Sequence, residues 1–250
     1  MIRNSIVRTI AATFVIRIPE PTAHDFPVPR GTGFFVSPQG HFMTAFHVIE
    51  KATDPDKIII SHDAEVGPGA FLRSPEVVET WQDFDLALLK LNFESHKDQE
   101  LLKEKKGFDF LEVDFAQHYE GTPVYSFGYP LPKIQVQARQ GLVVGLDWIC
   151  PRVSSAIIAS RYEAIGPIMT SGPPYHYVLD RPFNYGNSGG PIVVQETGKA
   201  IAAVVRFQPV QVPQPSGSSV GVVTVPSEYG IASSLRNIEN ILRQVVPSLN

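Results

Sequence analysis

Residues 185–194 read Tyr-Gly-Asn-Ser-Gly-Gly-Pro-Ile-Val-Val, which places Ser188 in a glycine-rich turn directly before an apolar strand. Such a turn can expose a hydroxyl at its tip, with neighbouring backbone N–H groups pointing at a developing oxyanion. By itself the segment is equally compatible with an ordinary β-turn, because Asn, Ser and Gly are common turn residues. Its chemistry therefore depends on whether a base and a carboxylate occur in matching surroundings elsewhere in the chain.

The runs of β-branched and aromatic residues along the chain predict a mainly β fold. Gly and Pro separate these runs, and no segment of helical period lies between successive strands, which argues against a parallel α/β sheet. We predict two antiparallel six-stranded barrels followed by a C-terminal α-helix. The strand runs are 10–18, 33–36, 57–61, 86–91, 123–127, 141–146, 156–159, 177–179, 191–194, 200–207 and 220–225.

The chain divides at the predicted linker between the two barrels. We place the N-terminal barrel at about residues 1–110, with residues 1–19 as its first strand, and the C-terminal barrel at about 120–226. The helix, at about 227–246, is predicted from apolar residues at spacings of three and four, with Ser227 as its N-cap. Two connections are expected to lie on the surface: the charged segment 94–106 and the Pro-, Gln- and Ser-rich segment 208–219.

Composition and charge exclude several classes of protein. Of the 250 residues, 43% are hydrophobic and 18% charged, and the net charge is -4, so no broad basic surface is expected for nucleic acid. No run approaches the roughly 20 apolar residues that span a membrane as a helix. Cys150 is the only cysteine, predicted to be a buried thiol, and Arg3, Arg8 and Arg17 interrupt the apolar N-terminus. These features predict a cytoplasmic protein without disulfides.

His47 and Asp85 are the candidates for the base and the carboxylate. His47 follows a strand–turn–strand pattern and stands where the second strand ends, although an ordinary buried histidine is the commoner case. Asp85 leads directly into the apolar strand 86–91, and Asp83, two positions earlier, is its rival. His41 and His47 alone make a weak metal pair, and the chain has no His-Glu-x-x-His motif or paired cysteines. We therefore expect no metal and no cofactor.

These segments resemble the trypsin-like serine proteases, specifically their HtrA/Deg-like bacterial branch. The histidine motif of that branch matches Gly31–Phe34, Gly40 and Met43–Val48. Its aspartate motif matches Asp85–Lys90, which favours Asp85 over Asp83, and its serine motif matches Gly186–Pro191 without change. The 250 residues correspond to the protease domain, without the PDZ domain that usually follows in this branch.

The resemblance implies a serine endopeptidase with the catalytic residues His47, Asp85 and Ser188 and the backbone N–H groups of Gly186 and Ser188 as the oxyanion hole. Its expected partners are a protein or peptide substrate and, through ordering of segments 171–174 and 208–219, an activating partner or a larger polypeptide. The alternative is a catalytically inactive peptide-binding or scaffold module on the same fold. An α/β-hydrolase is excluded, because its histidine follows the serine, whereas all seven histidines here precede Ser188.

Overall fold

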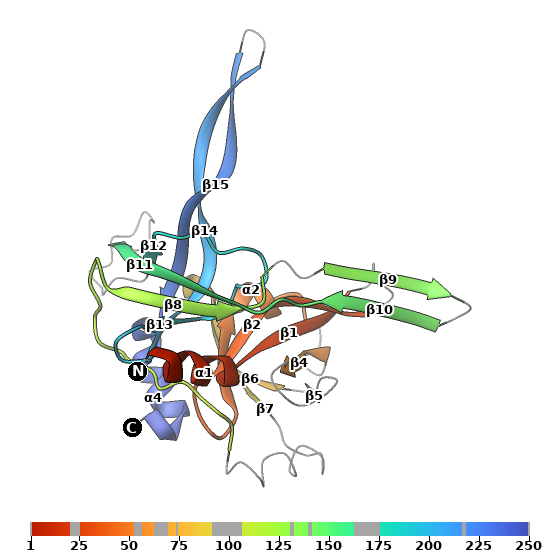
Figure 1. Cartoon of the computed structure of the whole chain (residues 1–250), viewed down its shortest axis with the longest axis vertical. Helices are drawn as coiled ribbons and strands as arrows, with labels where there is room; N and C mark the ends of the chain where they lie inside the picture. Colours follow the sequence, from red (N-terminus) through yellow and green to blue (C-terminus); the bar gives the residue numbers. More distant parts are fainter. Residues whose placement is uncertain are drawn as a thin grey trace.

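The computed structural model describes residues 2–20, 26–52, 57–62, 70–73, 75–91, 107–130, 133–139, 142–162, 176–216 and 219–249. Within them the chain forms a seven-stranded antiparallel sheet, a closed six-stranded barrel, a separate two-stranded sheet and a few short helices (Figure 1). The prediction of a mainly β fold is therefore confirmed. The predicted linker segment 94–106 and the segment 171–174 lie outside the described residues.

The N-terminal half is built on the seven-stranded sheet, whose strand order is β5-β4-β1-β2-β3-β7-β6. The rings of Phe14, Phe35 and Phe42 pack together in its core, with centroids 4.7–6.1 Å apart. In the described part of the chain β5 and β6 do not pair with each other, so this sheet is not the closed six-stranded barrel that we predicted. Its strands are β1 (Thr13–Glu20), β2 (Phe26–Phe35), β3 (His41–Ala45), β4 (Ile59–His62), β5 (Ala70–Arg73), β6 (Pro75–Trp81) and β7 (Leu86–Leu91).

The C-terminal half contains the closed barrel, in the order β11-β12-β15-β14-β13-β8. Its interior is filled by small and branched apolar residues such as Ile158, Ile192 and Ala202, all fully buried. This barrel agrees with the predicted six-stranded architecture. Its strands are β8 (Pro123–Gly128), β11 (Arg152–Tyr162), β12 (His176–Leu179), β13 (Pro191–Val194), β14 (Ala200–Ser216) and β15 (Ser219–Ser234).

Two hairpins extend beyond these units (Figure 1). One is the separate sheet of β9 (Lys133–Arg139) and β10 (Leu142–Trp148). The other is the continuation of β14 and β15, paired from Pro209 opposite Pro226 to Ser216 opposite Ser219. Segment 208–219, predicted as a surface loop, is therefore mostly strand. The prediction weighed only its Pro, Gln and Ser, whereas the Val-rich run that follows supplies a pairing partner.

The N-terminus is helical where a strand was expected. Helix α1 (Ile2–Ala12) precedes β1, and its Ile6 and Ile10, one turn apart, pack against two core clusters that each contain residues of both halves. Thr9 is buried, and its hydroxyl donates to the carbonyl of Ser5 at 3.0 Å, as helical geometry allows. The spacing of four between the isoleucines was the helical signal that the prediction overlooked.

The C-terminal helix is shorter than predicted. Strand β15 continues to Ser234 because residues 230–234 pair with β12 and β14. A 3₁₀ turn (Leu235–Ile238) and helix α4 (Glu239–Val245) follow. Ser234, not Ser227, caps this end, since its hydroxyl accepts from the backbone N–H of Arg236 at 3.3 Å. The apolar period predicted the packed face correctly, because Leu235, Ile238 and Leu242 are buried.

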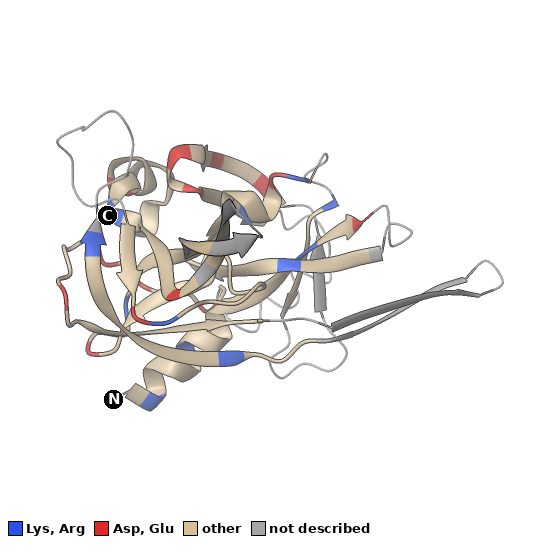
Figure 2. Ribbon diagram, turned by 90° about the horizontal axis from the view of Figure 1, so that it is seen from above, with Lys and Arg blue, Asp and Glu red and all other residues tan. Residues whose placement is uncertain are grey.

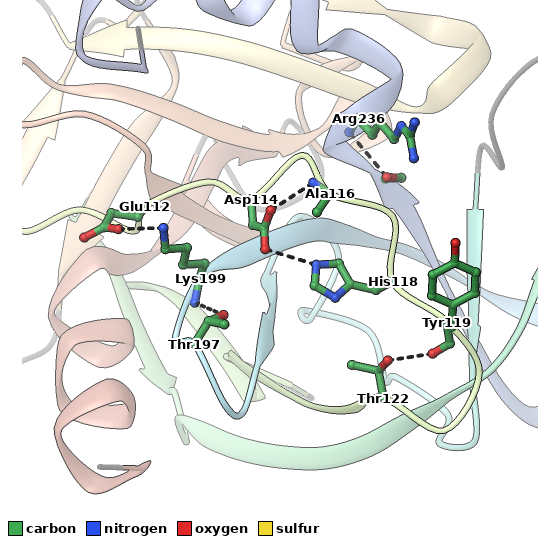
Figure 3. A network of polar contacts seen from close by, with 10 residues as sticks. Glu112, Asp114, Ala116, His118, Tyr119, Thr122, Thr197, Lys199 and Arg236 are labelled. Carbon is green, nitrogen blue, oxygen red and sulfur yellow. Dashed lines mark hydrogen bonds and ion pairs between the residues drawn. The ribbon is translucent and has the colours of Figure 1, made fainter.

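Polar contacts bind the segment between the two halves to the barrel (Figure 3). Asp114 accepts from the backbone N–H of Ala116 at 2.9 Å and contacts the His118 ring at 3.2 Å. Lys199 forms an ion pair with Glu112 at 3.3 Å. The backbone N–H of Ala200 donates to the carbonyl of Glu112, and the carbonyl of Ala200 accepts from the N–H of Asp114. Residues 112–114 are therefore held along the start of β14.

The surface shows mixed charge and an exposed thiol. Figure 2 shows acidic and basic residues interspersed over several elements rather than gathered on one. Cys150 is exposed, so the prediction of a buried thiol was wrong; it lies just after β10 and before β11, outside the strands that its apolar neighbours form. In the described residues, no helix has the length and apolar character needed to cross a membrane.

Candidate active site

His47 lies at the end of strand β3, on the single-turn helix α2 (Phe46–Ile49). The turn buries Val48 and Ile49 in the core and leaves the His47 side chain 41% exposed. The start of this helix is held beside Asp85, because the backbone N–H of Phe46 donates to the carbonyl of Asp85 at 3.0 Å. The predicted position at a strand end is thus the observed one, and the imidazole faces solvent rather than the core.

Asp85 contacts His47 through both carboxylate oxygens. One oxygen lies 2.7 Å from Nδ1 of the imidazole, and the other accepts from the His47 backbone N–H at 2.9 Å. Asp85 stands between a 3₁₀ turn (Gln82–Phe84) and β7, in a left-handed conformation with φ 53° that Asp and Asn tolerate better than other non-glycine residues. Its side chain is 30% exposed, so the carboxylate is only partly buried. The rival Asp83 is exposed and makes no such contact.

Three of the five amides in the turn that carries Ser188 have backbone acceptors, one of which, the carbonyl of Val204, lies on β14. The N–H groups of Asn187, Gly189 and Gly190 donate to backbone carbonyls at 2.7–3.0 Å. In the described part of the chain, those of Gly186 and Ser188 donate to none. Gly186 has φ +95°, and a Cβ there would collide with the carbonyl oxygen of Tyr129, so only glycine fits. The two amides predicted as oxyanion donors are therefore unused by the turn itself.

Thr32 on strand β2 joins the serine turn to the N-terminal half. Its hydroxyl donates to the carbonyl of Gly186 at 2.6 Å, and its backbone N–H donates to the carbonyl of Ser188 at 2.8 Å. Thr32 is fully buried, and its own carbonyl accepts from the hydroxyl of Thr44 at 2.8 Å. These two bonds give the carbonyls of Gly186 and Ser188 hydrogen-bond donors from the N-terminal sheet. The sequence analysis used Thr32 only as part of a motif; a hydroxyl residue between two glycines in an apolar strand was the available signal.

Replacing Thr32 with valine should loosen the serine turn. The substitution removes the hydroxyl at nearly constant volume and leaves the carbonyl of Gly186 without its donor, which costs about 1–3 kcal/mol. Thr32→Ser keeps the hydroxyl and is the matched control. We expect Thr32→Val to lower both the denaturant midpoint of unfolding and the rate at which Ser188 reacts with a fluorophosphonate. Equal behaviour of the two variants would show that the hydroxyl does not hold the turn.

His47, Asp85 and Ser188 line one cavity of about 500 Å³. Its apolar wall includes Phe183, whose ring is buried and lies against Gly230 of β15. The cavity also has cationic side chains on its lining, one of which, Arg30, forms an ion pair with Glu20. The structure thus brings together all three predicted side chains and both predicted amides. The other lining residues are Val48, Lys51, Asn184, Tyr185, Gly186, Val204, Val205, Arg206 and Phe207.

His176 on β12 is an ionisable neighbour of this site to which the sequence analysis gave no role. It is 5% exposed, and burial, together with the positive charge of Arg206, lowers its pKa to about 4, against an opposing effect of the Asp85 carboxylate. The ring is therefore neutral at pH 7. Nothing in the sequence distinguished His176 from the other histidines, because its burial depends on the tertiary fold, in which β12 pairs with β15, far along the chain.

The buried His176 should make folding sensitive to mild acid. Because its folded pKa lies near 4 and the unfolded value near 6.5, the unfolded chain binds more protons between these values. Stability from this residue is full above about pH 6.5 and falls as the pH drops towards 4, by up to about 3 kcal/mol. Denaturant unfolding of wild type and His176→Gln across this range tests the effect. We expect the variant to lose less stability than wild type between pH 7 and 4; parallel curves would contradict the assignment.

Residues 31–202 match the family model described as the trypsin-like peptidase domain. A probable periplasmic serine endoprotease, DegP-like, from Brucella suis is 27% identical over 84% of this chain and 33% of its own length. The corresponding Bartonella henselae protein is 27% identical over 78% of this chain and 30% of its own. The chain thus spans about a third of the length of the curated relatives it matches.

Solved structures share the fold at lower sequence identity. The HtrA-type protease AlgW with a tripeptide has a TM-score of 0.62 and 16% identity, covering 99% of this chain and 64% of its own. The serine endoprotease from Yersinia pestis has a TM-score of 0.59 and 18% identity, covering 99% of this chain and 67% of its own. At this identity the likeness shows the fold alone.

The same relatives correct one prediction. They are described as periplasmic, so the cytoplasmic location inferred from the single cysteine and the interrupted N-terminus is wrong. A lone cysteine excludes an intrachain disulfide but does not fix the compartment, because many folds need no disulfide for stability.

The family model covers well over half of the residues, including Ser188 and both members of the His47–Asp85 pair. The chain therefore belongs to the trypsin-like peptidase domain family.

Proposed function

We propose that the chain is a serine endopeptidase in which Ser188 is the nucleophile, His47 the general base and Asp85 the residue that orients it. The observation that carries this proposal is the His47–Asp85 pair, joined at 2.7 Å, in one cavity with Ser188. The Asp85 carboxylate accepts from Nδ1 and so favours the tautomer whose Nε2 can take a proton. Family membership and the match to serine endoproteases support the same reaction class.

The proposed reaction proceeds through an acyl-enzyme. The Ser188 hydroxyl loses its proton to Nε2 of His47 as its oxygen attacks the peptide carbonyl. The tetrahedral oxyanion accepts from the N–H groups of Gly186 and Ser188, the two amides that the turn leaves unused. His47 then gives its proton to the departing amine, and water hydrolyses the ester by the reverse sequence of steps. Loss of one oxyanion donor typically costs about 10²–10³ in turnover.

The proposed substrate is a protein or peptide, read from the cavity and from the strand beside it. Phe183, Val204 and Val205 give the cavity an apolar wall, and Lys51 and Arg206 add positive charge to its lining. An extended peptide bound along β14 would place its carbonyl near the serine turn. The AlgW structures were solved with a tripeptide and with a decapeptide, which agrees with peptide binding to this fold.

We further propose a periplasmic location for the chain, as in its curated relatives. Regulation by loop ordering remains a prediction. Segment 208–219, one of its two elements, is mostly paired strand, and the other, 171–174, lies outside the described residues. The inactive binding-module alternative is disfavoured, because a protein that only binds peptides does not need the His47–Asp85 pair or two unused amides in the serine turn.

Covalent labelling tests the proposal directly. The purified chain is incubated with a fluorophosphonate, the modified residue is identified by mass spectrometry, and cleavage of an unfolded protein is measured in parallel with and without a chelator. We expect labelling of Ser188, cleavage that labelling abolishes, and no effect of the chelator. Labelling absent under conditions where the chain is folded and His47 is intact would favour the binding module. Activity lost to the chelator and restored by zinc would overturn the assignment of the chemistry.

A further inference from the structure

The ribbon formed by the outer parts of β14 and β15, residues 207–216 and 219–229, stands away from the barrel (Figure 1). Among the described residues, β14 beyond residue 203 pairs only with β15, and β15 before Gly230 pairs only with β14. An isolated two-stranded ribbon is marginally stable in water, and each outer edge presents backbone N–H and C=O groups without strand partners. The ribbon therefore has two outer edges, one on β14 and one on β15.

Two facing prolines fix the hydrogen-bond pattern of the ribbon. Pro209 lies directly opposite Pro226, and the register runs without a shift from there to the tip. Directly opposed residues alternate between pairs that exchange two N–H···O=C bonds and pairs whose backbone groups point outward. Two prolines have no N–H to exchange, so theirs is an outward-facing pair. Every second pair towards the tip is then outward-facing as well: 211 with 224, 213 with 222, and 215 with 220.

This pattern makes the two edges unequal. On β14 the outward positions are Pro209, Gln211, Pro213 and Pro215, so only Gln211 offers an N–H. On β15 the outward positions towards the tip are residues 220, 222 and 224, and all three carry an N–H and a carbonyl. Proline is a common means of blocking a sheet edge. The edge of β14 at residues 209–215 is therefore closed to strand addition, and the edge of β15 at residues 220–224 is open.

The open edge is complementary to itself. Two copies of β15 placed antiparallel, with a two-fold axis at Val222, set Val222 against its equivalent and Val220 against Thr224 in both directions. Each of these pairs can exchange two backbone hydrogen bonds. The sequence between Arg206 and Glu228 contains no charged residue, so no like charges meet across the axis. The stretch from Val222 to Gly230 is about 25 Å long at roughly 3.3 Å per residue, which keeps the barrels of the two copies apart.

We propose that this chain dimerises through the outer edge of β15 at residues 220–224, forming a four-stranded sheet from two ribbons. The contact is isologous and therefore closes on itself. Because the prolines of β14 block the remaining edges of the joined sheet, no third copy can add. The ribbon is thus an assembly element that stops at two copies.

The test compares proline substitutions on the two edges of the same ribbon. Val222→Pro removes an outward N–H of β15, and Gln211→Pro removes the one outward N–H of β14; neither amide belongs to the ladder within the ribbon. Mass is measured by sedimentation velocity over a range of concentrations, and fluorophosphonate labelling of Ser188 reports folding. We expect wild type and Gln211→Pro to have the dimer mass and Val222→Pro to have half of it, all with equal labelling.

Amide hydrogen exchange gives a second readout on the unaltered chain. The amides of residues 220, 222 and 224 should exchange more slowly as protein concentration rises, whereas that of Gln211 should not change. This comparison holds even if Val222→Pro fails to fold. A monomeric wild type at all concentrations, an assembly that Val222→Pro leaves intact, or equal dissociation by Gln211→Pro would each overturn the proposal.

Discussion

Replacing Ser188 with alanine is expected to lower kcat for peptide cleavage by about a million-fold and to abolish fluorophosphonate labelling. The variant removes the hydroxyl that lines the cavity together with the His47–Asp85 pair, and loss of a triad serine removes nearly all of the catalysis that the triad provides. Alanine is smaller than serine and introduces no bulk, so the fold should be unchanged. Kinetics on an unfolded protein substrate and labelling with the same reagent measure both effects.

The control is Ser154→Ala on strand β11, a serine that does not line the cavity. It should label and cleave as wild type does. Undiminished labelling of Ser188→Ala would show that the reagent modifies another residue, and the nucleophile would then have to be assigned elsewhere. Residual cleavage well above background, unaffected by the reagent, would likewise contradict the triad.

Replacing Asp85 with asparagine should lower kcat by about 10⁴ while leaving the fold intact. The amide cannot accept from Nδ1 in the way the carboxylate does, so it favours the wrong imidazole tautomer and cannot stabilise the imidazolium. Asparagine keeps an oxygen for the backbone N–H of His47 and tolerates the left-handed conformation at φ 53°. Circular dichroism and unfolding curves should therefore match wild type, and only the kinetics should change.

Asp83→Asn is the matched control, because it makes the same chemical change two residues away, on an exposed side chain. We expect a change of less than about tenfold in kcat from this variant, since surface substitutions away from the site have small effects. If Asp83→Asn were the more damaging of the two, the assignment of the orienting carboxylate would be wrong.

The sequence predicted best those parts of the molecule whose signals are local. The strand at 86–91, the buried face of the C-terminal helical segment and the glycine turn at 186–190 each follow from neighbouring residues. His47 and Asp85 were singled out by their positions at strand ends, and the structure joins them at 2.7 Å. The number of residues between them does not predict this contact, whereas the resemblance of their two motifs to those of the trypsin-like family does.

The errors arose where distant packing decides the conformation. Helix α1 depends on packing against both halves, and β15 runs on to Ser234 because β12 and β14 supply its partners. The ribbon at 208–226 required recognising that a Pro-rich run can form one strand if its prolines fall on alternate, outward positions. The closure of a sheet is likewise a long-range property, which strand runs alone do not determine.

The hydrogen bonds of Thr32 to the serine turn have a consequence for biosynthesis. His47, Asp85 and Thr32 all precede residue 92, whereas the nucleophile and its glycines are translated about a hundred residues later. In the proposed mechanism, a chain that has folded only its first sheet holds the base and the carboxylate but no attacking hydroxyl. A chain that has folded only its C-terminal half is equally inactive, because the turn at 186–188 then lacks the hydroxyl and N–H of Thr32, which donate to its carbonyls. In the proposed mechanism, proteolytic competence therefore requires that both halves have folded and docked, so a partly folded chain cannot cleave its neighbours.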